Sequence, residues 1–309
     1  MFTDAPIPES QTPEFSIIIA VYNDWAPLER CLRSIDQQTH CPTFEVIVVD
    51  DGSDQSAPSS VRHESRRYPV TVVRQEHAGI ATARNRGIQE SVGRMLLFTD
   101  ADCRLHPECL SSLANTLIHH PEQKCFQLRL VGDCSNLVGK SEELRLVELQ
   151  KHTMEPNGSI RYLNTAGFAV RRERLPAGGE LFEQATLRAE DTLLLASLIQ
   201  DRELPFFVAD ATIQHALSLS LSECFSKAVR SAWLEGKTFE MIARKGVQIR
   251  MSYKDRISML RSTWKTAGAR SIGRRAWFVL VARQSIERVV TFVYNLSRIG
   301  RRLALGRQP

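Results

Sequence analysis

Apolar and polar residues alternate along the first 120 residues in blocks that predict strands and helices in turn. Four short apolar runs rich in Val, Ile and Leu, at 15–21, 46–49, 70–73 and 95–99, predict strands that are covered on both faces. Between them, apolar residues recur three and four positions apart, which is the period of a helix with one buried face. Strands that alternate with helices predict βαβ units and therefore an α/β fold with a mainly parallel, Rossmann-like sheet flanked by helices.

Local signals mark where three of these helices begin. One helix is expected just after Pro27, a second over 80–91 after Gly79, and a third near Pro107. Proline is tolerated in a first helical turn, because the N–H that it lacks has no partner there in any case. The pattern therefore predicts both the order of the elements and the approximate positions of the turns between them.

Polar side chains stand where three of the predicted strands end. Tyr22 and Asn23 follow the first strand, Asp50 and Asp51 follow the second, and Asp100 follows the fourth. In open α/β sheets, ligands bind outside the carboxyl ends of the strands, so we expect the three clusters to meet in one crevice. The chain has neither a G-x-G-x-x-G nor a G-x-x-x-x-G-K-[ST] motif, which argues against a dinucleotide site and a P-loop.

Asp100, which follows the fourth strand, belongs to the stretch FTDADC, in which Asp100 and Asp102 are two positions apart. In a strand, side chains at this spacing share a face, with Cα atoms roughly 6.5 to 7 Å apart. Two carboxylates that point the same way favour a cation between them. A solvated turn or a helix cap would explain the pair as well, because aspartate is common in both.

Composition places the chain among ordinary globular proteins. It has 309 residues, of which 43% are hydrophobic and 24% charged. Residues 1–14 lack the basic and apolar regions of a signal peptide, and no run of 18 apolar residues occurs, so we expect neither export nor a membrane span. The seven cysteines are scattered and include no C-x-x-C pair, which favours a reducing cytoplasm over disulfides or a zinc site.

Charge is distributed unevenly. Residues 250–309 carry 14 Lys or Arg against two acidic residues, a net charge of +12, so the first 249 residues carry −7 of the overall +5. Residues 272–303 intersperse arginines with aromatic and aliphatic side chains. Such a segment is typical of an amphipathic basic helix at an anionic lipid surface, but a helical hairpin packed on the preceding domain remains open. We expect no nucleic acid partner, because no binding module accompanies the charge.

Six stretches of the chain resemble, in order and spacing, the motifs of family 2 glycosyltransferases, which are nucleotide-sugar-dependent enzymes of the GT-A fold. The six stretches are SIIIAVYN (16–23), FEVIVVDDGSD (44–54), HAGIATARNRG (77–87), LLFTDADC (96–103), NTAGFAVRRE (164–173) and RAEDTLLLASLIQDRELPFFVADATIQH (188–215). The resemblance implies a GT-A domain over 15–240. We expect a disordered segment over 1–14 before it and a basic helical extension over 241–309 after it.

The resemblance also implies residues that bind the nucleotide-sugar donor. Asp51 would accept a hydrogen bond from a pyrimidine N3–H, and the ring of Tyr22 would lie against the base. Arg84 would reach a phosphate or the base edge, Ala20 would line the donor site, and Asp100 would contact the ribose or a metal-bound water. Plainer alternatives stay open, namely a turn-stabilising Asp51, a ring at the core edge for Tyr22 and an exposed helix arginine for Arg84.

A metal and a catalytic base are implied in the same way. Asp102 resembles the direct ligand of a divalent cation, Mg²⁺ or Mn²⁺, and His215 resembles a histidine that completes such a site. Cys103 stands where a third acidic residue is commoner in the family. In the pair Glu190-Asp191, at an expected helix start, Asp191 is the candidate general base. Helix capping for the pair and a structural role for His215 are the alternatives.

These features together predict an inverting enzyme that moves one sugar, expected from a UDP-sugar, to a hydroxyl of a glycan or lipid-linked acceptor. The chain lacks the Q-x-x-R-W signature of processive synthases, which favours transfer of a single sugar. We expect the enzyme in the cytoplasm, where it could lie peripherally on the inner face of the cell membrane. The alternatives are a non-catalytic protein that keeps the GT-A fold and a nucleotidyltransferase, although the stretch AVYNDWAP is neither glycine-rich nor basic, as the latter would require.

Overall fold

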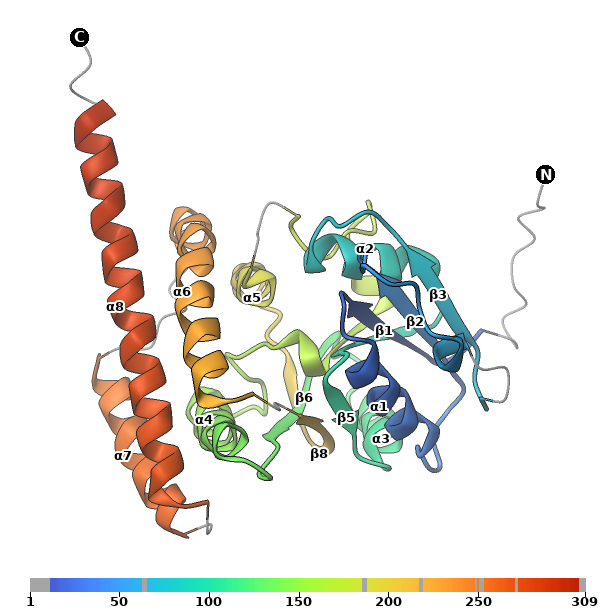
Figure 1. Ribbon diagram of the computed structural model, residues 1–309. Helices are drawn as coiled ribbons and strands as arrows, with labels where there is room; N and C mark the ends of the chain where they lie inside the picture. The colour runs from blue at the N-terminus through green and yellow to red at the C-terminus, as the bar shows by residue number, and fades with distance from the viewer. Residues whose placement is uncertain are drawn as a thin grey trace.

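The computed structural model describes residues 12–62, 66–184, 188–216, 219–247, 249, 253–269 and 272–305. Within this part of the chain one sheet lies between helices, and further helices stand beside it (Figure 1). The strands are β1 (Phe15–Val21), β2 (Phe44–Asp50), β3 (Val70–Arg74), β4 (Met95–Asp100), β5 (Cys103–Leu105), β6 (Cys125–Gly132), β7 (Phe168–Arg171) and β8 (Phe206–His215). The helices are α1 (Trp25–Asp36), α2 (Ile80–Glu90), α3 (Cys109–His119), α4 (Leu137–Thr153), α5 (Glu190–Asp201), α6 (Leu221–Arg244), α7 (Tyr253–Ala269) and α8 (Arg274–Leu305).

The sheet has the strand order β3-β2-β1-β4-β7-β6-β8-β5. Its first half is parallel, as the sequence predicts, because β1 pairs in parallel with β2 and β4, and β2 with β3. The second half is mixed, since β7 is antiparallel to β4 and β6, and β5 is antiparallel to β8. The predicted α/β class is confirmed, with a more mixed sheet than the first 120 residues suggest.

The sheet curls, and the chain path shows why. β4 ends at Asp100 and β5 begins at Cys103, yet the two strands stand four places apart in the sheet. Only a curled sheet brings its β5 edge back to the carboxyl end of β4. This curvature places the end of β8 beside the residues that follow β4.

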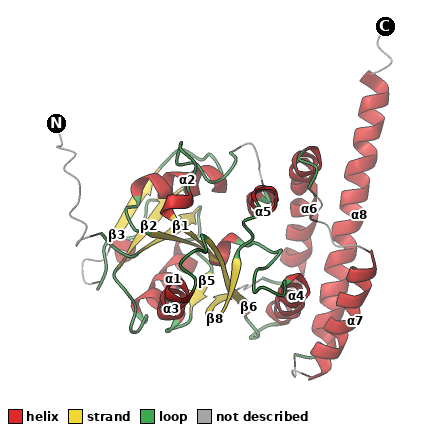
Figure 2. Cartoon of the chain, turned by 180° about the vertical axis from the view of Figure 1, so that it is seen from behind, coloured by secondary structure: helices red, strands yellow, loops and turns green. Residues whose placement is uncertain are grey.

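Apolar layers cover both faces of the sheet. Ile17 and Ile19 of β1 point to the layer that α1 and α3 close, whereas Ile18 points to the layer that α2 and α5 close. This alternation explains why β1 reads as a continuous apolar run. Figure 2, from behind, shows the two helical layers on opposite sides of the strands.

The C-terminal helices pack on the α/β unit. α8 lies along α6 and crosses α4, and α7 and α8 form a hairpin (Figures 1 and 2). Leu144 of α4 joins Ala267 of α7 and Leu280 of α8 in a shared apolar cluster. A hairpin packed on the preceding domain, one of the two interpretations of the tail, is therefore what the described residues form.

The expected segment boundaries can be placed on these elements. Position 240 falls inside α6, which continues to Arg244. Residues 1–11 of the expected disordered segment lie outside the described residues, while the Glu14 N–H donates to the Thr43 carbonyl. The seven cysteines are all free thiols. Among the described helices, none combines the length and the hydrophobicity that a bilayer crossing requires.

Candidate functional site

The three polar clusters lie at one edge of the sheet, as predicted. Strand register sets Val21 opposite Asp50 and Ala20 opposite Asp100, so β1 stands between the two acidic strand ends. The Asn23 N–H donates to the hydroxyl of Ser53 at 2.9 Å, which joins the turn after β1 to the turn after β2. Ala20 is half-buried at this edge.

The carboxylate of Asp51 is buried and holds the turn that starts α2. One oxygen accepts from the Ala78 N–H and the Gln75 amide at 2.9 and 2.8 Å, and the other accepts from the Gly79 N–H at 2.9 Å. Gly79 has a φ of 93°, a conformation that suits glycine. This network is the turn-stabilising role that the sequence left open for Asp51, and its contact with a nucleobase remains a prediction.

An aromatic pair stands above this turn. The rings of Tyr22 and His77 stack with their centroids 4.3 Å apart, and Tyr22 is 45% exposed. Tyr22 is therefore not a buried core ring, and its face is open to a planar partner. The sequence contains no signal for His77 other than its place in the stretch HAGIATARNRG (77–87).

Arg84 lies fully buried between two acidic motifs. Its guanidinium donates to Asp100 at 2.7 Å and to Glu190, and it lies 5.7 Å from the centroid of the Phe182 ring. Burial disfavours the charged form, but Glu190 and Asp100 outweigh burial and raise the pKa of Arg84. The alternative of an exposed helix arginine is wrong. Through its two ion pairs, Arg84 connects β4, the strand that ends at Asp100, to α5, which begins at Glu190.

Asp102 and His215 face each other across the curl of the sheet. Asp102 Oδ2 and His215 Nε2 are 3.3 Å apart, and Cys103, which pairs with His215 in the β5–β8 register, brings its sulfur within 4.8 Å of both ligand atoms. Burial disfavours the charged form of His215, but the hydrogen bond with Asp102 outweighs burial and raises the pKa of His215. Burial likewise opposes ionisation of Asp102, but the contact with His215 lowers the pKa of Asp102. Among the described residues, these three form the one cluster of metal-ligating side chains.

The chemistry of this cluster fits a divalent cation. Carboxylate oxygen and imidazole nitrogen are ligands of Mn²⁺, and the carboxylate also suits Mg²⁺. Burial and the charges of Asp100 and Asp102 raise the pKa of the Cys103 thiol well above its usual value. The oxygen and nitrogen of the facing pair are therefore the ligands that a hard cation would use.

Asp191 lies in the first turn of α5, next to Glu190, which pairs with Arg84. Its Oδ1 accepts from the Thr192 N–H at 2.6 Å and from the Thr192 hydroxyl at 3.1 Å, so it also satisfies a free N–H of the first turn. Burial and the neighbouring charge of Glu190 raise the pKa of Asp191 to about 7. Glu190 is held by Arg84, so the two members of the pair have different surroundings.

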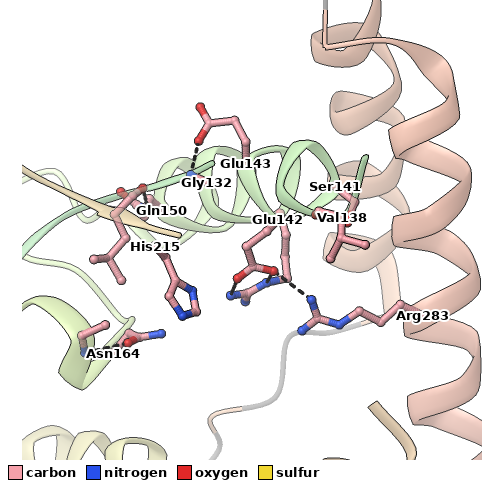
Figure 3. Close-up of polar contacts among 12 residues, drawn as sticks. Gly132, Val138, Ser141, Glu142, Glu143, Gln150, Asn164, His215 and Arg283 are labelled. Carbon is pink, nitrogen blue, oxygen red and sulfur yellow. Dashed lines mark hydrogen bonds and ion pairs between the residues drawn. The ribbon is translucent and has the colours of Figure 1, made fainter. Parts of the chain in front are cut away.

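A polar cavity of about 160 Å³ lies between His215 and the C-terminal helices. Glu142 of α4 accepts from Arg145 Nε at 3.0 Å and from Arg283 of α8 at 2.8 Å (Figure 3). Burial opposes ionisation of Glu142, but Arg145 and Arg283 hold its pKa well below the usual range. Asn164 lies on the opposite side of the cavity, near His215 (Figure 3).

Nothing in the sequence predicts this cavity wall. Helix α4 buries Glu142, Glu143, Glu148 and Gln150 and has no clear apolar stripe, so nothing in its pattern indicates a buried charge.

A larger cavity of about 440 Å³ opens near Lys124 and Arg202, where β6 and β8 begin. It contains none of the predicted site residues.

A GT-A enzyme is the class that this fold and these strand-end carboxylates define. The family model described as "Glycosyl transferase family 2" matches residues 16–175, just over half of the chain, and the chain belongs to this family. Similar sequences are named glycosyltransferases. Glycosyltransferase AglE of Haloferax volcanii is 35% identical over 111 residues, and uncharacterized glycosyltransferase EpsJ of Bacillus subtilis is 32% identical over 191 residues.

These sequence matches are partial. The AglE match covers 35% of this chain and 36% of that protein, and the EpsJ match covers 60% and 53%. A third relative, dolichol-phosphate mannosyltransferase of Pyrococcus furiosus, is 32% identical over 33% of this chain and 29% of its own length. The chain thus spans only part of the curated relatives that it matches.

Solved structures agree with the fold over nearly the whole chain. Mannosyltransferase PcManGT from Pyrobaculum calidifontis, in complex with GDP-Man and Mn²⁺, superposes with a TM-score of 0.60 at 19% identity and covers 93% of this chain and 89% of that chain. S. aureus TarS 1–349 in complex with UDP-GlcNAc gives 0.52 at 16% identity, with 92% of each chain covered. At these identities the likeness establishes the fold alone.

Proposed function

We propose that this chain is an inverting glycosyltransferase that moves one sugar from a nucleotide-diphosphate sugar to a hydroxyl of a glycan or lipid-linked acceptor. The observation that carries the proposal is the double contact of Arg84, which joins Asp100 at the end of β4 to Glu190 at the start of α5 and so places Asp191 beside the donor motif. The raised pKa of Asp191, about 7, suits a general base at neutral pH. The proposed base, Asp191, and the donor motif that contains Asp100 are thus held in a fixed position relative to each other.

The donor is proposed to lie over the carboxyl ends of β1, β2 and β4. Tyr22 offers an exposed ring for a base, and Asp51 lies in the turn just behind it. Two structural neighbours bind GDP-Man and UDP-GlcNAc, which supports a nucleotide sugar as the donor class. We infer UDP as the nucleotide because a carboxylate at the place of Asp51 would accept a hydrogen bond from the uracil N3–H.

Asp102 and His215 are the residues that would hold Mg²⁺ or Mn²⁺, and Asp100 would act on the ribose or on the metal through water. The bound cation would supply positive charge to the diphosphate and to the leaving group. That a neighbour of the same fold is solved with Mn²⁺ supports this assignment. Arg84 has no such role in the proposal, because Asp100 and Glu190 already occupy its guanidinium.

The proposed step couples one proton transfer to one substitution. Asp191 takes the proton of the acceptor hydroxyl while that oxygen forms a bond to the anomeric carbon of the donor sugar. The bond from this carbon to the diphosphate oxygen breaks, and its electron pair leaves with the nucleoside diphosphate. Attack from the face opposite the leaving group inverts the configuration.

We also propose that the reaction takes place at the cytoplasmic face of an anionic membrane. Val289, Phe292, Val293 and Leu296 recur at helical spacing on α8 and are between 49% and 63% exposed, with Arg288 exposed beside them. The C-terminal end of α8 extends past α6 (Figure 1). An apolar stripe with arginine next to it is the composition that lies in an anionic lipid interface.

The test of the enzymatic proposal is a screen of nucleotide sugars against the purified chain. A donor should raise the Tm with Mg²⁺ or Mn²⁺ present, because a bound ligand stabilises the folded state, and should be hydrolysed slowly or transferred to an acceptor. Stabilisation by UDP without turnover of any donor would favour the non-catalytic alternative. Absence of both effects across uridine and guanosine donors would refute the proposal.

A further inference from the structure

Helix α6 places Lys227 on the wall of the cavity that also contains His215. A capping box fixes the start of this helix, since Ser220 accepts from the Glu223 N–H and Glu223 accepts from the Ser220 N–H. One face of α6 then lines the cavity with Cys224, Lys227 and Ala228. Lys227 is half-buried and belongs to the cavity lining.

The other cations of this wall already have carboxylate partners. Arg145 and Arg283 share Glu142, and Arg188 lies 3.8 Å from Glu235. Within the described residues, Lys227 forms no ion pair. A lysine held beside a polar cavity without a carboxylate partner is available to an anion that enters from outside.

Lys227 shares its cavity with a residue of the donor side of the site. His215 lines the same cavity as Lys227, and its Nε2 lies 3.3 Å from Oδ2 of Asp102. Asp102 comes two residues after Asp100, the last residue of β4. The cavity that Lys227 lines therefore extends to the histidine that contacts the aspartate pair after β4.

Charge balance suggests which anion it serves. As the sugar leaves, an electron pair moves onto the diphosphate oxygen, and this negative charge develops next to the carboxylates of Asp100 and Asp102. Arg84 contributes little compensation, because Asp100 and Glu190 occupy it. Apart from a metal, Lys227 is the cation among the described cavity residues that is free to offset the charge, and an ammonium has three donors for phosphate oxygens.

We propose that Lys227 binds the diphosphate of the donor and stabilises the leaving nucleoside diphosphate. The inference rests on the proposed glycosyltransfer and adds to it a residue outside the family model, which ends at residue 175. It also gives α6 a part in the active site, so that the first C-terminal helix is more than a link to the tail.

The test compares Lys227→Gln with Lys227→Arg and with Arg230→Gln, an exposed position on the same helix that does not line the cavity. Calorimetry with UDP, UMP and uridine, with Mn²⁺ present, isolates the diphosphate. Lys227→Gln should weaken UDP binding roughly 10- to 100-fold, as expected for a lost charge-assisted hydrogen bond, and leave uridine binding unchanged. Lys227→Arg should keep most of the affinity, Arg230→Gln should match the wild type, and donor kcat/KM should follow UDP affinity.

Three results would overturn the inference. UDP affinity in Lys227→Gln equal to that of the wild type would show that the ammonium does not touch the diphosphate. A raised acceptor KM with unchanged UDP affinity would assign Lys227 to an anionic group of the acceptor. Failure of the wild-type protein itself to bind any nucleoside diphosphate would overturn the glycosyltransfer proposal, and this inference with it.

Discussion

Replacement of Asp191 by asparagine tests the assignment of the base. The amide keeps the size of the side chain, and its oxygen can still accept from the Thr192 N–H and hydroxyl, so the start of α5 should be preserved. It cannot take up a proton at neutral pH. We expect transfer to fall by roughly 10² to 10⁴, the usual contribution of a general base, while UDP affinity stays within a few-fold.

The pH dependence follows from the pKa of about 7. Only the deprotonated carboxylate accepts a proton, so wild-type kcat/KM should rise with pH through about 7 and then level off. The residual activity of Asp191→Asn should not show this rise with pH on the acidic side of the profile. The measurement is initial transfer rates for both proteins between pH 5.5 and pH 8.5, a range chosen to be roughly one unit or more on either side of the pKa.

Stability should change in the opposite sense. The folded pKa of Asp191 is raised from 3.8 to about 7, so its favourable contribution is complete below about pH 4 and is lost as pH rises through 7. The shift corresponds to at most about 4 kcal/mol. Asp191→Asn should therefore be more stable than the wild type at pH 8, with a smaller advantage at pH 5.5, by thermal or urea unfolding.

Asp210→Asn is the matched control, because Asp210 is exposed on β8 and is not one of the predicted site residues. It should change neither the rate nor the pH profile. Full activity of Asp191→Asn, or an acidic limb that persists in it, would mean that another group is the base. A loss of UDP binding as large as the loss of rate would instead make Asp191 a donor-site residue.

The remaining predictions concern the metal site at Asp102, the buried ion pairs of Arg84 and the exposed apolar residues of α8. Asp102→Ala should abolish the part of UDP binding that depends on Mn²⁺, with little change in Tm because the side chain is about one-third exposed; calorimetry that shows unchanged Mn²⁺-dependent binding would remove Asp102 from the metal site. Arg84→Met should lower the free energy of unfolding by about 3 to 5 kcal/mol, because it leaves Glu190 and Asp100 without their partner; a loss below about 1 kcal/mol in urea unfolding would show that these ion pairs are not needed. Phe292→Gln combined with Val293→Gln should release the protein from anionic vesicles in co-sedimentation and leave UDP binding unchanged, whereas Ile118→Gln, at an exposed apolar position on α3, should not. A wild-type protein that ignores anionic vesicles at low and high salt would refute the membrane proposal.

Strand-end chemistry could be predicted from the sequence because it depends on local pattern and on one topological rule. Each apolar run ended in polar residues, and parallel pairing necessarily puts those ends on one edge. Arg84 shows how the same reasoning can mislead. It stands four residues before the buried Ile88, on the face that the helix period buries, but an arginine is ordinarily exposed. Its burial depends on the ion pairs with Asp100 and Glu190, which join elements far apart in the sequence.

The pairing of Asp102 with His215 could not follow from pattern. Their side chains meet because the sheet curls and β5 pairs with β8, and this contact joins residues more than 100 positions apart. The family resemblance suggested a histidine in the metal site, but no local signal in the chain gives the register. The Glu142 cluster was equally hidden, because the helix that bears it shows no periodic apolar face.

Helix α8 shows why its composition supported two interpretations at once. Its first half packs Ala276 and Leu280 into the cluster with α4 and α7, and Arg283 reaches the buried Glu142. Its second half leaves Phe292 and Val293 exposed. A truncation before α8 would remove the apolar face of the second half, but it would also take from Glu142 one of its two arginines and open the cavity wall that carries Lys227. Loss of activity after truncation would therefore say nothing about lipid, and only surface substitutions in the second half separate membrane attachment from the integrity of the active site.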